Sequence, residues 1–252
     1  MAKIFAIGNQ KGGVGKTSTC GALAAAFSEK GKKVLVADLD PQAGLTTSLG
    51  FDPDSFEKTI YHTFLEEEDI KTIAVSTKLP KVDLAPANLD LAGAEAELIG
   101  EIGWDRTLKD ALAPIEKSYD LIFLDCPPSL GVLTTNALVA AHTVIVPLQC
   151  EYLALRALRQ LQKIITKVKR KANPSLQVCI LRTMVDMRTT HCREVFEEIG
   201  QVGGEYVFKA FIRRTIKFAD ATAAGQPILS YAKDSEAAQA YRELAKEIQN
   251  YA

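Results

Sequence analysis

The chain has 252 residues, of which 47% are hydrophobic and 24% are charged, and its formal net charge is −1. This composition is typical of a soluble globular protein with a sizeable core, and the net charge alone does not indicate nucleic-acid binding. Five cysteines without a CxxC pair predict reduced thiols, and the three scattered histidines match no zinc-site spacing. Because neither a signal-peptide pattern nor an apolar run of membrane-spanning length is found, we expect a cytoplasmic protein.

The first informative stretch is a glycine-rich turn between a predicted strand, Lys3–Gly8, and an alanine-rich helix that begins near Lys16. Strand, glycine-rich turn and helix are the context of a phosphate-binding loop, in which backbone N–H groups and the helix dipole face a polyphosphate. Lys16 is placed to reach the β- and γ-phosphates, and the Thr17 hydroxyl to ligate Mg²⁺. The predicted nucleotide loop comprises Lys11, Gly12, Gly13, Val14, Gly15, Lys16, Thr17 and Ser18.

This loop contains two lysines, because Gln10 stands at the usual first glycine position and Lys11 follows it. The run Lys11-Gly-Gly-Val-Gly-Lys-Thr17 resembles the deviant Walker A motif of the ParA/MinD family. The resemblance implies that Lys11 reaches the nucleotide of a partner subunit, so that the ATP-bound state is a sandwich homodimer. The alternative is an ordinary surface lysine beside a glycine-rich turn.

A second buried strand is predicted over residues 33–39, and it ends in Asp38-Leu-Asp-Pro-Gln42. Carboxylates at the carboxyl end of a parallel strand lie where open α/β sheets bind ligands, although either aspartate could simply cap the next segment. The run is similar to the Walker A′ motif of the same family. That resemblance implies that Asp40 positions or activates the attacking water, and Asp40 is also a candidate Mg²⁺ ligand through water.

The middle of the chain predicts short helices over 59–67 and 92–99, a strand over 82–87 and a helix over 104–117. The apolar run Leu121–Leu124 then ends in Asp125, as in a Walker B strand, where the carboxylate can hold Mg²⁺ through a water. The following Cys126-Pro-Pro-Ser-Leu-Gly131 suits a nucleotide-sensing switch. A nucleophilic Cys126 is the rival interpretation, but no histidine lies near it in the sequence.

A helix predicted over 151–171 separates apolar from basic residues. Leu158, Leu161, Ile165 and Val168 form an apolar stripe. The opposite face carries Arg156, Arg159, Lys163, Lys167 and Arg170. Solvated helix faces normally mix charges of both signs, so this one-sign stripe favours an anionic partner.

The positive charge continues beyond this helix, through predicted strands at 176–184 and 206–211 and a helix at 190–200. Residues 151–217 contain 14 Lys/Arg and 6 Asp/Glu, whereas the remainder contains 16 and 25. The segment Ile212-Arg-Arg-Thr-Ile-Lys217 adds Arg213, Arg214 and Lys217. Clustered cations without particular base readers fit contact with a phosphate backbone.

The last helix, predicted over 234–251, mixes charges around an apolar stripe, which indicates a docking helix rather than one lying on a membrane.

The resemblance to ParA (Soj-type) ATPases covers essentially the whole chain, and includes Gln149-Cys-Glu-Tyr152, Thr183-Met-Val-Asp-Met-Arg188 and Gly225-Gln-Pro-Ile228. It implies one domain over 1–252, with a mostly parallel twisted sheet and helices on both faces. It also implies that the ATP-bound dimer binds DNA non-specifically through positions matching Arg188 and Lys217. Arg213 and Thr215 replace the proline and asparagine that lie near the adenine in the family, and with Met184 they complete the predicted nucleotide site.

The implied activity is a Mg²⁺-dependent ATPase switch in chromosome or plasmid partition, located on the nucleoid and stimulated by a ParB-type centromere-binding protein. An orphan ParA that positions another cargo has the same chemistry and stays open. A MinD-like membrane ATPase is disfavoured by the last helix. A nitrogenase-iron-protein-like redox ATPase needs two well-placed cysteines per subunit, and a non-enzymatic scaffold does not explain the loop and its aspartates.

Overall fold

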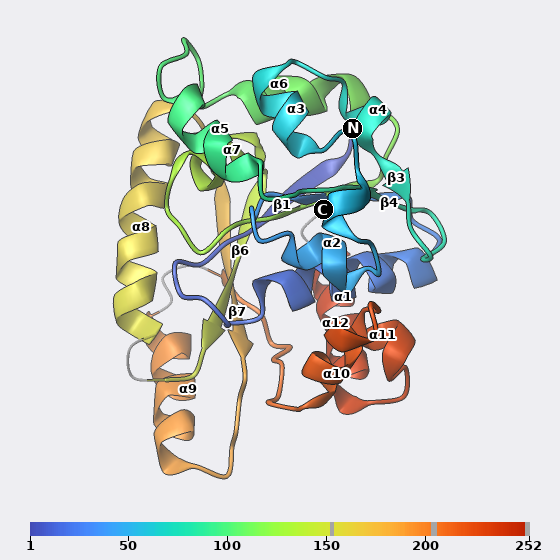
Figure 1. Ribbon diagram of the computed structural model, residues 1–252. Coiled ribbons are helices and arrows are strands. Elements are labelled where there is room, and N and C mark those ends of the chain that lie inside the picture. Colours follow the sequence, from blue (N-terminus) through green and yellow to red (C-terminus); the bar gives the residue numbers. More distant parts are fainter. Residues whose placement is uncertain (152–153, 203–205, 250–252) are drawn as a thin grey trace.

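The computed structural model describes residues 1–151, 154–202 and 206–249. These residues form an α/β structure around an eight-stranded sheet with the strand order β3-β4-β2-β5-β1-β6-β7-β8 (Figure 1). Seven strands are parallel, and β3 alone pairs antiparallel, with β4. The strands are β1 (Lys3–Ile7), β2 (Val34–Asp38), β3 (Val75–Ser76), β4 (Val82–Ala85), β5 (Leu121–Asp125), β6 (Thr143–Gln149), β7 (Gln177–Thr183) and β8 (Tyr206–Val207).

The central strands are buried on both faces, which explains their continuous apolar sequences. Successive residues of β1 face opposite sides, so that Ile4 and Ala6 join one apolar cluster and Phe5 and Ile7 join the other. Two separate cores therefore sandwich the sheet. The predicted fold class, a mostly parallel sheet with helices on both faces, is confirmed.

Each core is closed by its own layer of helices. The Phe5 side is covered by α1 (Lys16–Glu29), α2 (Gly44–Ser48), α10 (Lys217–Ala223), α11 (Ile228–Tyr231) and α12 (Glu236–Gln249). The other side is covered by α3 (Ile60–Leu65), α4 (Ile70–Ile73), α5 (Leu91–Leu98), α6 (Thr107–Leu112), α7 (Val132–Ala140), α8 (Ala154–Lys171) and α9 (Thr190–Val202). A 3-10 turn, η1, spans Pro53–Ser55. In Figure 1, α8 stands at one edge of the molecule and α10–α12 lie beneath α1.

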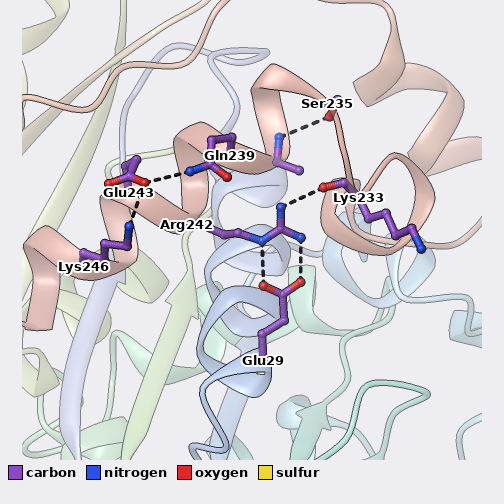
Figure 2. A network of polar contacts seen from close by, with 8 residues as sticks. Glu29, Lys233, Ser235, Gln239, Arg242, Glu243 and Lys246 are labelled. Carbon is purple, nitrogen blue, oxygen red and sulfur yellow. Dashed lines mark hydrogen bonds and ion pairs between the residues drawn. The ribbon is translucent and has the colours of Figure 1, made fainter.

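The last helix docks on the first, as its apolar stripe predicts. Tyr241 of α12 is buried, and its hydroxyl lies 2.9 Å from Thr19 Oγ1 of α1. Arg242 donates from Nε and a terminal nitrogen to both carboxylate oxygens of Glu29 at 2.7 and 2.8 Å, and its other terminal nitrogen donates to the Lys233 carbonyl (Figure 2). No helix in the described ranges has the length and apolar character needed to span a membrane.

Some boundaries differ from the sequence expectations for identifiable reasons. The helix expected over 104–117 is split into α6 and a 3-10 turn, η2 (Ala113–Ile115). Pro114 has no N–H to donate to the preceding turn, and Gly103 upstream has a left-handed φ of 77°. The strand expected over 206–211 retains only the two residues of β8.

Candidate functional site

The glycine-rich loop joins β1 to α1 at the carboxyl edge of the sheet, and α1 begins at Lys16 as predicted. Gly13 and Gly15 have φ values of 71° and 90°, which side-chain-bearing residues rarely adopt. The loop lines a pocket of about 280 Å³. The pocket is formed by Gly12, Gly13, Gly15, Lys16, Thr17, Ser18, Asp40, Pro128 and Met184.

The two lysines of the loop point in different directions. Lys16 is 7% exposed, and burial lowers its pKa while the charge of Asp125 opposes the shift. The Lys11 ammonium instead lies 3.0 Å from Gln149 Oε1 and 2.6 Å from Glu151 Oε2. Lys16 therefore faces the buried carboxylates, whereas Lys11 faces the end of β6.

The two aspartates after β2 have different environments. Asp38 is fully buried, and one carboxylate oxygen accepts hydrogen bonds from the backbone N–H and the hydroxyl of Thr46, at 2.8 and 2.9 Å. Its other oxygen accepts from the Asp40 N–H. Asp38 thus has the capping role that the sequence left open, and Asp40 lines the pocket beside the loop.

Asp125 ends β5 directly beside Asp38, its register partner on β2. Asp125 is fully buried, and neither of its carboxylate oxygens has a hydrogen-bond partner. Burial and the charge of Asp38 raise its pKa well above the usual range, and the nearby Thr17 hydroxyl and Lys16 act in the opposite direction. An orphaned carboxylate beside a hydroxyl and a phosphate loop has the oxygen ligands that hydrated Mg²⁺ prefers. These residues therefore fit a Mg²⁺ site.

A second pocket of about 260 Å³ adjoins the first and shares Gly15, Ser18 and Met184 with it. Its wall is mostly apolar, and Arg213 and Thr215, two of the expected nucleotide-site residues, line it. The loop is fixed here because the Thr183 hydroxyl donates to the Val14 carbonyl at 2.9 Å. Sequence reasoning did not single out Ile212, Phe218 and Tyr241 as pocket residues, and their apolar character alone gave no signal.

The segment that follows Asp125, a candidate switch from its sequence, approaches Glu95 of α5 at Gly131. Gly131 has an ordinary φ of −89°, but a Cβ there would collide with Glu95 Oε1. Because Glu95 Oε1 is the far end of a flexible side chain that can turn aside, this contact does not by itself require glycine at position 131. Cys126 is buried and its thiol pKa is raised by burial, so nothing here supports the nucleophile interpretation.

The candidate DNA-contacting cations form two groups. Arg188, Arg213, Arg214 and Lys217 line one groove of about 700 Å³, together with Asp186 and Glu236. Arg159, Lys163, Lys167 and Arg170 are exposed along α8, and their apolar partners Leu158, Leu161, Ile165 and Val168 are buried as predicted. The side chain of Arg156 lies outside the described residues, as do residues 152–153 at the expected start of that helix. The Arg188 side chain is 89% exposed, and its guanidinium donates two hydrogen bonds to Asp186, at 2.7 and 2.6 Å.

The first strand of the mostly parallel sheet leads into a glycine loop with left-handed residues, and a buried lysine follows that loop. Aspartates stand at the ends of β2 and β5. This arrangement defines a P-loop nucleoside triphosphatase fold. Comparison with known proteins narrows this class. The family described as "AAA domain" matches residues 2–178. The sporulation initiation inhibitor protein Soj of Bacillus subtilis is 41% identical over 249 residues, which are 98% of each chain. The chromosome partitioning protein ParA of Myxococcus xanthus is 40% identical over 98% of this chain and 88% of its own length.

Among solved structures, a protein from Mycobacterium smegmatis described as cobyrinic acid a,c-diamide synthase, with bound ADP and magnesium, is 41% identical. The match has a TM-score of 0.89 and covers all of this chain and 95% of the other. The same protein was also solved with an ATP analogue and magnesium. The chain belongs to the ParA (Soj-type) family of deviant Walker A P-loop ATPases, which confirms the family resemblance inferred from its motifs.

Proposed function

We propose that this protein is an ATP-dependent switch: with ATP and Mg²⁺ it closes into a sandwich homodimer, binds duplex DNA without sequence preference and releases it after hydrolysis. The observation that carries the proposal is the divergence of the two loop lysines. Lys16 serves phosphates within its own subunit, whereas Lys11 points away from that pocket to the end of β6, where its side chain is 35% exposed and can serve a second subunit.

The nucleotide contacts follow from the two adjoining pockets. The loop from Lys11 to Ser18 binds the phosphates, and the apolar pocket with Met184, Arg213 and Thr215 receives the base. When Mg²⁺ is bound, Thr17 would be its direct protein ligand, and Asp125 and Asp40 would hold it through waters. The ion neutralises phosphate charge that develops during hydrolysis. Asp40, at the pocket rim, orients the attacking water.

Two subunits double the number of phosphate contacts available to DNA, so DNA affinity differs strongly between monomer and dimer. The groove around Arg188 and the basic face of α8 supply these contacts. The role we propose is chromosome or plasmid partition in the cytoplasm, on the nucleoid, with a ParB-type stimulating partner. The name of the Myxococcus xanthus relative, a chromosome partitioning protein, supports the partition role. An adjacent ParB-type gene would favour partition over positioning of another cargo.

A second candidate comes from the description of the Mycobacterium smegmatis structure as a diamide synthase. Cysteine-type glutaminase sites need an accessible nucleophilic thiol, whereas all five cysteines of this chain are buried. We therefore favour the DNA-binding switch.

The test is binding of a random-sequence duplex in the presence of ADP, ATP, or ATP with the Asp40→Ala variant, across a salt series. Tight binding is expected only with ATP, is strengthened by Asp40→Ala, and falls roughly a thousandfold between about 50 and 200 mM salt if six or more phosphates are contacted. Arg188→Glu is expected to weaken it about tenfold or more. Lys71→Glu, the same charge reversal at an exposed residue of α4, is the matched control and should change it little. Binding that ignores the nucleotide refutes the switch.

A further inference from the structure

The Lys11 ammonium is held by two side chains from the end of β6. Gln149 is the last residue of that strand, and Glu151 follows two positions later. Lys11 Nζ donates to Gln149 Oε1 at 3.0 Å and to Glu151 Oε2 at 2.6 Å. The Gln149 amide also donates to the other Glu151 oxygen, which closes a three-residue ring. We call Gln149 and Glu151 the Lys11 anchor.

This anchor keeps the second lysine away from the pocket of its own subunit. Lys16 lines the 280 Å³ pocket, and its ammonium is 3.4 Å from the Lys11 carbonyl, but the Lys11 side chain extends to β6. Lys11 therefore has a carboxylate partner within its own chain before any second subunit arrives.

We propose that Gln149 and Glu151 are positioning residues that hold Lys11 in cis in the separated subunit, and that they release it when Lys11 binds the nucleotide of a second subunit. The inference rests on the proposed function, because it needs the ATP-dependent dimer. The ion pair between Lys11 and Glu151 is weak enough to break, because the two side chains are 35% and 48% exposed and solvent screens their attraction. A triphosphate carries more negative charge than one carboxylate and can displace it.

The position of the anchor also links it to the basic helix. Glu151 lies three residues before Ala154, the first residue of α8, whose exposed cations are candidates for DNA contact. Release of Lys11 thus removes a contact just before α8. The residue that holds Lys11 and the helix that carries the basic face are therefore neighbours in the chain.

The test measures the dimer dissociation constant by sedimentation velocity on the full chain with Mg²⁺ and a non-hydrolysable ATP analogue. Glu151→Gln keeps the size of the side chain and removes its charge, so the dimer should tighten by about two- to fivefold per released subunit. Glu68→Gln removes the same charge from another exposed ion pair, Lys58–Glu68 at 2.7 Å, and is the matched control that should leave dimerisation unchanged.

A second pair of variants shows whether the effect passes through Lys11. In a Lys11→Ala background, Glu151→Gln is expected to have no further effect on dimerisation, because the anchored group is gone. The proposal is overturned if Glu151→Gln behaves like Glu68→Gln, if it weakens the dimer, or if its effect persists without Lys11. If the wild-type chain stays monomeric with the analogue, the sandwich dimer itself is refuted. If the wild type dimerises but Glu151→Gln has no effect, only the Lys11 anchor is refuted.

Discussion

Asp38 and Asp125 are register partners on the adjacent parallel strands β2 and β5, and both carboxylates are fully buried. Only Asp38 is satisfied, by Thr46 and the Asp40 N–H, and Asp125 has no hydrogen-bond partner. Two carboxylates so placed cannot both ionise without cost, and burial raises the pKa of Asp38 to about 6. The nucleotide site is therefore electrostatically strained before any cation binds.

This strain predicts that Asp125→Asn stabilises the free protein while abolishing Mg²⁺-dependent hydrolysis. Removing one buried, unpartnered charge should raise the free energy of unfolding by about 1 kcal/mol at pH 8. Burial raises the pKa of Asp125 well above its usual range, so the folded wild type binds this proton more readily than the unfolded chain, and its stability is lost as pH rises from the ordinary aspartate pKa, about 4, toward the raised value. Urea unfolding at several pH values should show the advantage of the variant growing across that window. A variant less stable than wild type at pH 8 contradicts this account.

The neighbouring aspartates predict opposite phenotypes. Asp40→Ala removes a pocket-lining carboxylate that accepts an exposed hydrogen bond from the Gln42 N–H, so hydrolysis should fall at least about a hundredfold with stability nearly unchanged. Asp38→Ala leaves the buried N–H and hydroxyl proton of Thr46 without an acceptor and should cost about 2–3 kcal/mol of stability. Parallel measurement of ATP turnover and urea unfolding separates the two roles. Equal stability losses in both variants would show that the assignment is wrong.

The sequence predicted the strands, the two faces of helices and the loop because each has a strong local signal, such as Lys16 after Gly15 or Asp125 after four apolar residues. It could not separate Asp38 from Asp40, since their difference depends on Thr46 of α2, a five-residue helix with no periodicity to detect. It also missed Phe218 and Tyr241 in the apolar pocket beside the loop, because only the tertiary fold brings α10 and α12 to the loop. That residues 1–252 form one domain stays a prediction.

Gly12 and Gly15 of the loop differ in backbone conformation but not in the space around them, so alanine variants of the two can be compared directly. A Cβ would meet no atom within 4 Å at either position, but only Gly15 has a positive φ, of 90°. Gly15→Ala should therefore cost about 1–2 kcal/mol of stability through backbone strain alone, and Gly12→Ala should be close to neutral. Thermal or urea unfolding of both variants without nucleotide tests this. Equal losses would mean that the left-handed conformation at Gly15 is not what requires glycine.

The last prediction concerns how much the polar contact between α1 and α12 contributes to the free energy of unfolding. Arg242 joins α12 to Glu29 of α1 through two hydrogen bonds and to the Lys233 carbonyl through a third (Figure 2). Arg242→Met retains the apolar stem but removes all three, and because the pair is partly exposed the loss should be about 1 kcal/mol. Lys246→Met, which breaks only the exposed Glu243 pair within α12, is the control and should stay within about 0.5 kcal/mol of wild type. If urea unfolding gives the two variants the same stability, the Arg242 fork does not hold α12 in place, and the docking depends on the apolar stripe and on Tyr241 alone.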